Sequence, residues 1–313
     1  MSDCDVLLLG DYFCDLIITG LSEVPRLGAD VFGEAMEIAP GGAYILSVAL
    51  HRLGVRTRWR ARLGNDLFSQ FIVSEARREG LDQSLFEARP APYRSLSVSF
   101  SFAHDRGFIS YLDPAPADGL PFHLVAEQRP RWVINVPFDG SAESRRFVDA
   151  VHAQGGRVYT DCQYVTTTLA EPGLADLLCQ VDIFAPNESE ARQLTGAATP
   201  EEALARLSDL CPLVIVKCGA DGALARSGDQ VWRAPAIPVQ TIDTTGAGDC
   251  FNAGFLAARL RGEPIPVCLQ WGNIAGGLST TARGGAAAAP TFTELQAWLA
   301  RSAAPESRTS RTL

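Results

Sequence analysis

The chain has 313 residues, of which 47% are hydrophobic and 20% charged, with 28 Gly and 19 Pro. This composition is typical of a folded protein and excludes disorder, collagen and a simple coiled coil. The formal net charge of −9 opposes a general nucleic-acid surface, which needs clustered Lys and Arg, so we expect no nucleic-acid partner. Lys217 is the only lysine, and all the other Lys/Arg positions are arginine.

The eight cysteines are scattered, with no C-x-x-C pair and no histidine at zinc-site spacing. We therefore expect reduced thiols that pack as small hydrophobes. The first residues are acidic where a signal peptide would be basic, and no apolar run approaches the roughly 20 residues that a membrane span needs. These features predict a soluble cytoplasmic protein with no membrane partner.

Short apolar runs alternate with helical stretches along most of the chain. Apolar, β-rich runs predict buried strands at residues 5–9, 132–136, 157–160, 181–184 and 213–216. Apolar residues at helical spacing predict helices at residues 42–53, 66–78, 142–153, 188–194, 247–260 and 293–299. This alternation indicates an α/β fold in which helices cover both faces of a mostly parallel sheet.

Two stretches, 30–38 and 95–111, break this pattern because apolar and other residues alternate in them at period two without an intervening helix. The second contains a predicted turn at 104–107. We expect a small antiparallel sheet, the lid, that projects from the body and covers a site. Its exposed strand edges predict a homodimer.

The chain shows no internal repeat and no interdomain linker. We therefore predict one domain over residues 1–302, with the lid formed by about 12–39 and 93–113. The small and polar residues 303–313 predict a disordered tail.

The most informative segment is TIDTTGAGDCFNAGF at 241–255, a glycine-containing turn that leads into a helical pattern. Gly246 and Gly248 let the backbone approach a ligand closely, and the first amides of the helix lack intrahelical acceptors, which makes the turn an anion hole. Asp249 lies beside these amides, where we expect the helix dipole to keep it ionised and able to accept a proton. The alternative is a simple helix N-terminus in which Thr245 and Asp249 cap backbone amides.

Two other phosphate-binding motifs do not fit. A Walker A loop needs G-K-[ST], but Lys217 lies between Val216 and Cys218. A Rossmann G-x-G-x-x-G needs a third glycine and an acidic residue roughly 20 positions further on, and the turn at Gly246 and Gly248 does not continue in that way. The sequence therefore excludes both nucleotide-binding classes.

The segment DTTGAGD at 243–249, followed by FNAGF at 251–255, resembles the C-terminal signature of the ribokinase-like (PfkB) carbohydrate kinases. The resemblance extends to PGG at 40–42, RLGNDLF at 62–68, APNESEA at 185–191, and VKCG at 216–219 with GA at 222–223. It covers about residues 5 to 300. It implies a ribokinase-like three-layer α/β/α sandwich with a small β-sheet lid.

The resemblance also implies how the turn acts. Asp249 would be the general base for the acceptor hydroxyl. The amides of Gly246, Ala247 and Gly248 would hold the charge that develops on the transferred phosphoryl group.

A nucleotide site for ATP and Mg²⁺ follows from the same resemblance. Its residues would be Asn187, Glu190, Lys217, Gly219, Gly222 and Asn273. Asn187 and Glu190 would approach the phosphates and hold Mg²⁺ through water, although this pair also fits a helix capping box. Lys217 fits equally a solvated strand end, and Asn273, on the adenine side in relatives, fits equally a helix-surface residue.

Asp243 and Thr245, with the loop 281–288, occupy positions where many family members bind a monovalent cation. The resemblance thus implies a K⁺ site, which the sequence does not decide.

On the acceptor side, Asp15 falls where family members bind sugar hydroxyls and Asp11 is similarly placed, although an Asp after a strand is otherwise a turn former. Gly41 and Gly42 would let the backbone approach the substrate. The family pattern G-G-x-x-x-N places an asparagine at position 46, but this chain has Leu46, which binds no hydroxyl. Together with aromatic residues of the lid, which fit equally a small core of the lid itself, this departure leaves a nucleoside-like acceptor open beside a pentose or hexose.

These features predict an ATP-dependent kinase that phosphorylates a primary hydroxyl of a sugar or sugar-like compound. The alternatives are a nucleoside kinase on the same fold and a catalytically inactive relative that senses sugars or nucleotides. The intact segment 243–249 favours an enzyme, because a sensor has no need for a base beside an anion hole.

Overall fold

The computed structural model describes residues 4–102, 106–115, 118–162 and 168–303. At its centre lies an eight-stranded sheet with the strand order β14-β13-β12-β11-β10-β9-β1-β4. The strands are β1 (Val6–Leu8), β4 (Thr57–Trp59), β9 (Trp132–Ile134), β10 (Arg157–Thr160), β11 (Ile183–Phe184), β12 (Val214–Lys217), β13 (Ala223–Ser227) and β14 (Gln230–Ala234). Neighbours from β4 to β12 pair in parallel, and β13 and β14 add an antiparallel edge.

Every strand predicted for the body lies in this sheet. Successive residues of a strand point to opposite faces of the sheet. In β1, Val6 and Leu8 therefore belong to one hydrophobic core and Leu7 to the other. The sequence analysis missed β4, β13 and β14, which lie at the two edges of the sheet. Polar and arginine residues interrupt the apolar runs of these edge strands.

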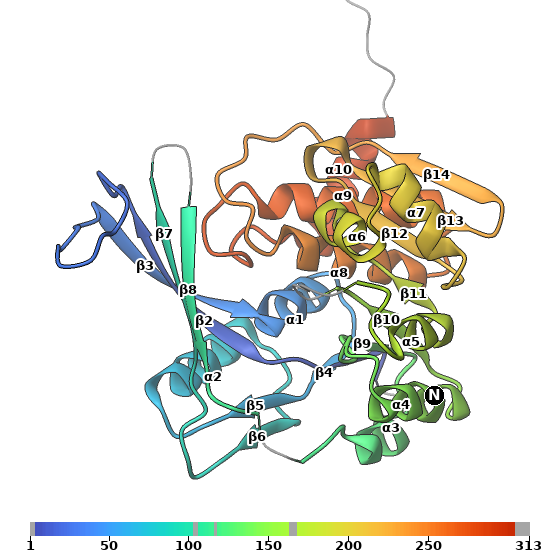
Figure 1. Ribbon diagram of the computed structural model, residues 1–313, viewed down its shortest axis with the longest axis horizontal. Helices are drawn as coiled ribbons and strands as arrows, with labels where there is room; N and C mark the ends of the chain where they lie inside the picture. The colour runs from blue at the N-terminus through green and yellow to red at the C-terminus, as the bar shows by residue number, and fades with distance from the viewer. Residues whose placement is uncertain (1–3, 103–105, 116–117, 163–167, 304–313) are drawn as a thin grey trace, which may run out of the picture.

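Helices cover both faces of the sheet (Figure 1), so the predicted three-layer sandwich is confirmed. One face carries α1 (Ala43–Arg52), α2 (Leu67–Glu79), α8 (Ala247–Leu260), α9 (Ile265–Ser279) and α10 (Phe292–Ala303). The other carries α3 (Phe122–Gln128), α4 (Ala142–Ala153), α5 (Leu174–Gln180), α6 (Glu188–Thr195) and α7 (Pro200–Ser208). The sequence analysis missed α9 because this helix is buried on most sides and shows no single apolar stripe.

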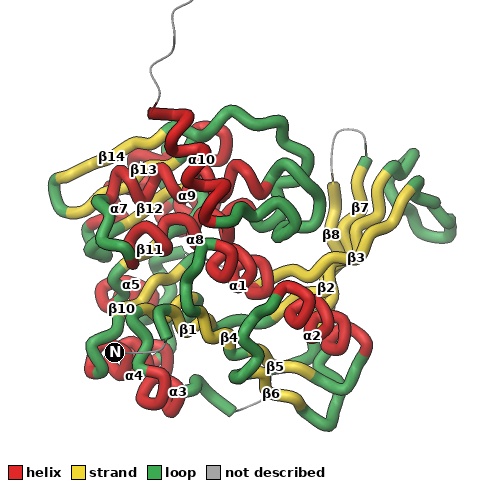
Figure 2. Tube along the Cα trace, turned by 180° about the vertical axis from the view of Figure 1, so that it is seen from behind, coloured by secondary structure: helices red, strands yellow, loops and turns green. Residues whose placement is uncertain are grey.

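The lid is a four-stranded sheet that stands off from the body (Figures 1 and 2), with the order β3-β2-β7-β8. Its strands are β2 (Tyr12–Thr19), β3 (Ala35–Gly42), β7 (Ser95–Ser101) and β8 (Arg106–Leu112). The prediction of an antiparallel lid is wrong for its central pair, because β2 and β7 run parallel. The strand expected from residue 30 starts only at Ala35. A short parallel pair, β5 (Ala61–Leu63) and β6 (Phe86–Ala88), lies beside the lid.

Some predictions fall on parts of the chain that the structure does not describe. In the predicted turn at 104–107, the first two residues lie outside the described ranges, and Arg106 and Gly107 already belong to β8. Ala303 ends α10 instead of beginning the tail, and 304–313 lie outside the described residues. Within the described ranges, no helix combines the length and the apolar character that a bilayer crossing needs.

Candidate active site

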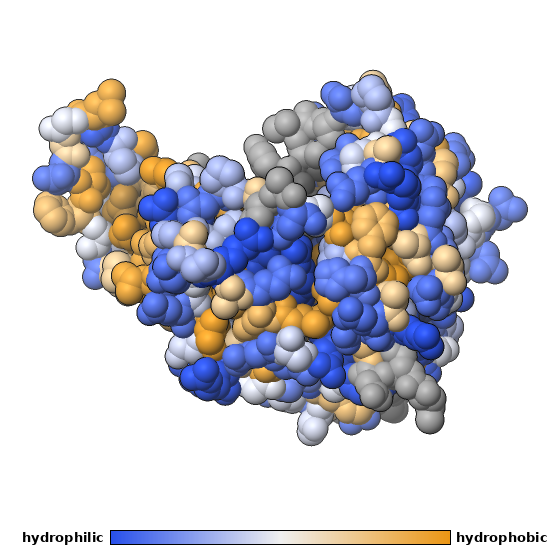
Figure 3. All heavy atoms as spheres, turned by 90° about the horizontal axis from the view of Figure 1, so that it is seen from below, coloured by the Kyte–Doolittle hydropathy of each residue, from blue (hydrophilic) through white to orange (hydrophobic). Residues whose placement is uncertain are grey.

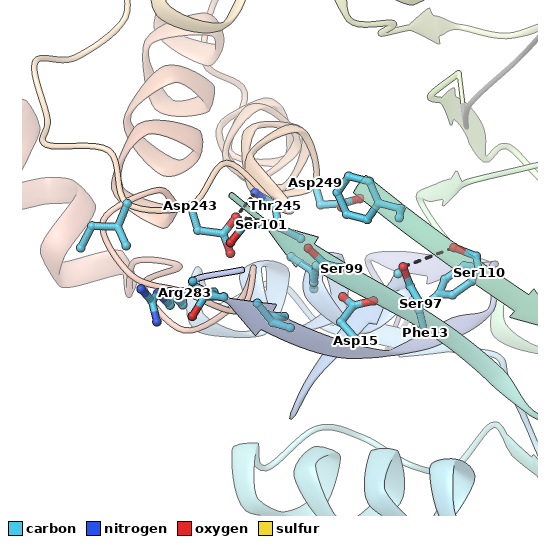
Figure 4. A pocket seen from close by; sticks show the side chains of 18 of the residues that line it. Phe13, Asp15, Ser97, Ser99, Ser101, Ser110, Asp243, Thr245, Asp249 and Arg283 are labelled. Carbon is cyan, nitrogen blue, oxygen red and sulfur yellow. Dashed lines mark hydrogen bonds between the residues drawn. The ribbon is translucent and has the colours of Figure 1, made fainter. Parts of the chain in front are cut away.

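A cavity of about 640 Å³ lies between the lid and the N-terminal end of α8 (Figure 4). Its lid wall follows the period of two that a strand imposes: Asp15, Ile17 and Thr19 of β2 face the cavity, as do Ser97, Ser99 and Ser101 of β7. Ser110 of β8 adds a hydroxyl that donates to Ser97 Oγ at 3.3 Å. The opposite wall contains Asp243, Thr245, Gly246 and Asp249.

The turn before α8 leaves amides free on this wall. Gly246 adopts a left-handed φ of +69°, and a Cβ there would lie 2.8 Å from the Ile45 side chain, so the turn requires glycine. No side chain caps α8, and the interpretation that Thr245 and Asp249 merely cap the helix is therefore wrong. Ala247 N donates to the Thr244 carbonyl at 3.2 Å, whereas the amides of Gly246 and Gly248 have no acceptor among the described residues. Of the three amides expected to form the anion hole, those of Gly246 and Gly248 are thus free among the described residues, whereas that of Ala247 is bonded to the preceding turn.

Asp249 lies half-buried on the cavity wall, in the first turn of α8. Burial raises the pKa of Asp249 to about 7, and the negative charge of Asp161 adds to this shift. The expectation that the helix dipole keeps Asp249 fully ionised is therefore corrected. A pKa near neutrality suits a general base, because the carboxylate is then both available and basic enough to accept a proton.

Lys217 ends β12 next to this helix and is not a solvated strand-end residue, since its side chain is only 10% exposed. Its Nζ forms an ion pair with Asp161 Oδ2 at 2.5 Å and lies 3.4 Å from Asn252 Oδ1. Asn252 Nδ2 donates to the same Asp161 oxygen at 2.5 Å, and Tyr159 OH donates to Asn252 Oδ1 at 2.9 Å. These side chains form one connected polar network beside the anion hole.

A second, shallower hollow of about 670 Å³ lies on the far side of Lys217. Asn187, Glu188, Lys217 and Gly219 line it. Asn187 caps α6 by accepting from Glu190 N at 2.9 Å, and Glu190 accepts from Asn187 N at 2.8 Å, so the alternative of a capping box is confirmed. Burial, together with the negative charge of Asp161, raises the pKa of Glu190 to about 7.

The model of the pfkB family carbohydrate kinases matches residues 15–292. The chain belongs to this family. It is thus a carbohydrate kinase, a phosphotransferase with an alcohol group as acceptor.

The chain is similar over nearly its whole length to several relatives. The ribokinase of Bacillus subtilis strain 168 is 25% identical over 304 residues, which cover 93% of this chain and 98% of the relative. The structure of Arabidopsis thaliana ribokinase complexed with ribose and ATP aligns with a TM-score of 0.82 at 23% identity, over 96% and 99% of the two chains. The fructokinase of Vibrio cholerae O395, bound to fructose, ADP and calcium ion, aligns with a TM-score of 0.73 at 27% identity, over 96% and 100%.

Two residues that we expected at the nucleotide, Asn273 and Gly222, line neither hollow of the PfkB kinase, and both contact the end of β14. Asn273 is buried, and its Nδ2 donates to the carbonyls of Ala234 and Pro235 at 3.0 Å each. This amide fixes the end of β14, so Asn273 is not a helix-surface residue, and its place on the adenine side stays a prediction. Gly222 adopts a φ of +86° and leaves room for the Ala234 carbonyl, which a Cβ would meet at 2.1 Å.

Asp243 and Thr245 tie the turn before α8 to the following loop. Asp243 Oδ1 accepts from Thr245 N at 2.9 Å and from Thr245 Oγ1 at 2.7 Å, while Oδ2 accepts from Gly284 N at 3.1 Å. These bonds hold the anion hole in place, and the implied K⁺ site stays a prediction.

On the expected acceptor side of the kinase, Asp15 lines the cavity, and the sugar contact expected of it stays a prediction. Its carboxylate faces the cavity and packs on Gly41, where a Cβ would come within 2.2 Å of Asp15 Oδ2. Burial, together with the negative charge of Asp243, raises the pKa of Asp15 to about 6. Gly42 has a φ of +62°, lines the cavity and precedes α1.

Two other acceptor-side expectations do not hold. Asp11 does not line the cavity, because its carboxylate forms a bidentate ion pair with Arg62 at 2.6 and 2.9 Å. Leu46 is fully buried in the core, and its neighbour in α1, Ile45, lines the cavity instead. The apolar change at position 46 therefore removes no hydroxyl partner from the wall of this cavity.

The sequence analysis missed the serines of the lid, Asp161 and Asn252. The alternation SLSVSFS at 95–101 contains the serine signal, but it does not show which face meets a ligand. Asp161 directly follows a parallel strand, and side chains at the carboxyl ends of such strands gather at one edge of the sheet. The lid aromatics fit two different roles, a wall of the cavity and a small core of the lid itself. Phe108 lines the cavity, whereas the ring centroids of Phe100 and Phe102 lie 6.0 Å apart, so these two rings pack against each other.

Proposed function

We propose that this PfkB kinase transfers the γ-phosphoryl group of ATP to a primary hydroxyl of a sugar or sugar-like compound. One observation carries the proposal. Asp249 and the free amides of Gly246 and Gly248 form one wall of a cavity whose opposite wall is a hydroxyl-rich lid (Figure 4). A proton acceptor and an anion hole thereby face the place where a polyhydroxyl compound fits.

The acceptor binds against the lid in this proposal. Asp15 and the lid hydroxyls Ser97 and Ser99 supply acceptors and donors for several sugar hydroxyls. Asp249 removes the proton of the attacking hydroxyl as its oxygen bonds to phosphorus, and the bond from phosphorus to the ADP oxygen breaks. The amides of Gly246 and Gly248 stabilise the charge on the phosphoryl oxygens.

The nucleotide binds in the second hollow, with its phosphates directed toward Lys217. Next to Lys217, Asp161 lies close enough to Glu190 and Asp249 to raise the pKa of both carboxyls, and such a group of carboxylates favours a cation. Among the described residues no group of three or more His, Cys, Asp or Glu side chains is arranged to hold a metal directly. The residues therefore fit a hydrated Mg²⁺ that arrives with the nucleotide and neutralises its phosphate charge, with Glu190 as a ligand through water.

The lid face that points away from the cavity fits a second copy of the chain. Leu16, Val98 and Ile109 occupy one row across this face, and Ile38 extends the row on β3. Ile38 is 46% exposed and Ile109 66%. Hydrophobic residues gather over the projecting lid (Figure 3), and we propose that a homodimer buries them.

An ADP-release screen tests the proposed function. The purified chain and its Asp249→Asn variant are assayed with MgATP across sugars, sugar acids, sugar phosphates and nucleosides, each with and without K⁺. We expect turnover on a sugar-like acceptor that the variant loses. Turnover on nucleosides alone would favour a nucleoside kinase, and no turnover on any acceptor would favour a sensor. A rate that K⁺ does not change would remove the predicted cation site.

A further inference from the structure

The position of the chain's single lysine is the starting observation. All other Lys/Arg positions are arginine, yet the side chain beside the anion hole is Lys217. Lysine carries a compact ammonium that reaches one point, whereas arginine carries a planar fork with five donors. The ammonium lies close to the turn, because a Cβ on Gly248 would be in ordinary contact with Lys217 Nζ at 3.4 Å.

Lys217 is next to residues of both hollows, and we call this place the junction. Its side chain lines the nucleotide side, together with Asn187 and Gly219. Its Nζ reaches Gly248, which is flanked by a residue of the acceptor cavity, Asp249. In an in-line transfer the phosphoryl group passes from donor to acceptor through this junction.

The charges around the junction require a cation. Asp161, Glu190 and Asp249 are close enough for Asp161 to raise the pKa of both other carboxyls, and Lys217 opposes these shifts. An arriving phosphoryl group adds more negative charge. Without a fixed positive charge, the carboxylates would repel the group that the free amides attract.

The ammonium is held from behind by a fixed frame. Asp161 accepts from both Lys217 Nζ and Asn252 Nδ2 at 2.5 Å, and the Tyr159 hydroxyl fixes the Asn252 amide from the other side. Tyr159 and Asn252 are fully buried, so this frame is rigid and keeps Nζ from turning away from Gly248.

We propose that Lys217 contacts the transferred phosphoryl group as a catalytic residue and that Asp161 is the positioning residue that holds Lys217 against the anion hole. The proposal rests on the proposed kinase function. During transfer Lys217 Nζ donates to a phosphoryl oxygen, while Asp249 takes the proton of the acceptor. Asp161 touches neither substrate and acts only through the ammonium.

A double-mutant cycle on the full chain tests this division of roles. We expect Lys217→Met to lower kcat about 100-fold, the scale of one lost transition-state contact, with the acceptor KM unchanged. Asp161→Asn alone should lower kcat about tenfold. In the Lys217→Met background it should change kcat less than twofold, because a residue that acts through Lys217 has nothing left to position.

The double variant also guards against misfolding, since it removes both charges together and leaves no unpaired carboxylate. The pair Arg56 and Asp5, joined at 2.9 Å in a part of the body outside both hollows, provides the matched control. The double variant Arg56→Met with Asp5→Asn should leave kcat unchanged. Equal effects of Asp161→Asn in both backgrounds would overturn the positioning role, as would a raised Mg²⁺ requirement in Asp161→Asn, which would make Asp161 a metal ligand.

A spectroscopic measurement separates this proposal from the kinase function itself. Because the chain has one lysine, labelling with ¹³C-lysine gives a single Cε signal for Lys217. We expect MgAMP-PNP, which carries a γ-phosphoryl group, to shift this signal more than MgADP does, and Asp161→Asn to reduce that difference. Equal shifts, or none, would overturn the contact whatever the enzyme phosphorylates. A response without turnover on any acceptor would uphold the contact and reject the function.

Discussion

Replacing Asp249 by Asn tests the central carboxylate, because the change keeps its shape and removes its ability to accept a proton. The amides of Gly246 and Gly248 stay free, so nucleotide binding should persist. We expect turnover to fall by about a hundredfold or more, the scale of a lost general base. In the unmodified enzyme, kcat/KM should rise with pH and level off above about 7, the pKa of Asp249 in the free protein.

The same substitution has a stability consequence of known sign. Folding raises the pKa of Asp249 from 3.8 to about 7, so between these values the folded protein binds a proton that the unfolded chain has lost. The free energy of unfolding therefore falls, relative to the Asn variant, as the pH rises through this window. The full shift corresponds to about 4 kcal/mol. Because Asp249 faces a cavity that admits water, we expect about half of this, about 2 kcal/mol.

Thermal unfolding of both proteins at pH 5 and pH 8, without ligand, measures this effect. Between pH 5 and pH 8 about 60% of this effect is lost, which is about 1.3 kcal/mol and corresponds to about 3 °C for a chain of this size. The Tm of the Asn variant relative to the unmodified protein should thus be about 3 °C higher at pH 8 than at pH 5. Asp82→Asn is the control, since hydrogen bonds from Ser84 and the charge of Arg58 lower the pKa of Asp82 despite its partial burial, and its cost should be equal at both values. An equal difference at both pH values for Asp249→Asn would refute the raised pKa.

Three further changes test other parts of the proposal. Ser99→Ala should raise the acceptor KM about tenfold, the loss of one partly buried hydrogen bond, and leave the ATP KM unchanged, as initial rates would show. Glu190→Gln should raise the Mg²⁺ concentration for half-maximal rate severalfold, and chelation of Mg²⁺ by EDTA should stop turnover until the metal is restored. Ile109→Glu should give a monomer by light scattering with an unchanged circular dichroism spectrum, whereas a dimer would exclude the lid face as the interface.

The parts of the fold that the sequence predicts share one property: a single contiguous segment contains their signal. The turn at Gly246 and the helix after it can be predicted because glycine, helix start and carboxylate follow one another within a few residues. The capping box of Asn187 and Glu190 is equally local. By contrast, Asp161 and Lys217 are 56 residues apart along the chain, and their ion pair exists only because β10, β11 and β12 end at the same edge of the sheet. No spacing rule predicts such a pair.

The same contrast, between residues that are contiguous and residues that are distant along the chain, distinguishes the phosphate half of the proposed site from its acceptor half. The proposed phosphate half comes mainly from one turn and one helix, whose residues are contiguous in the sequence. The acceptor half is assembled from three lid strands, each of which contributes two to four side chains to the cavity wall, and a shift of one residue in any strand would turn a polar residue outward. We therefore expect acceptor specificity to follow the lid positions, above all Asp15, Ser97 and Ser99, and not position 46, whose side chain lies in the core.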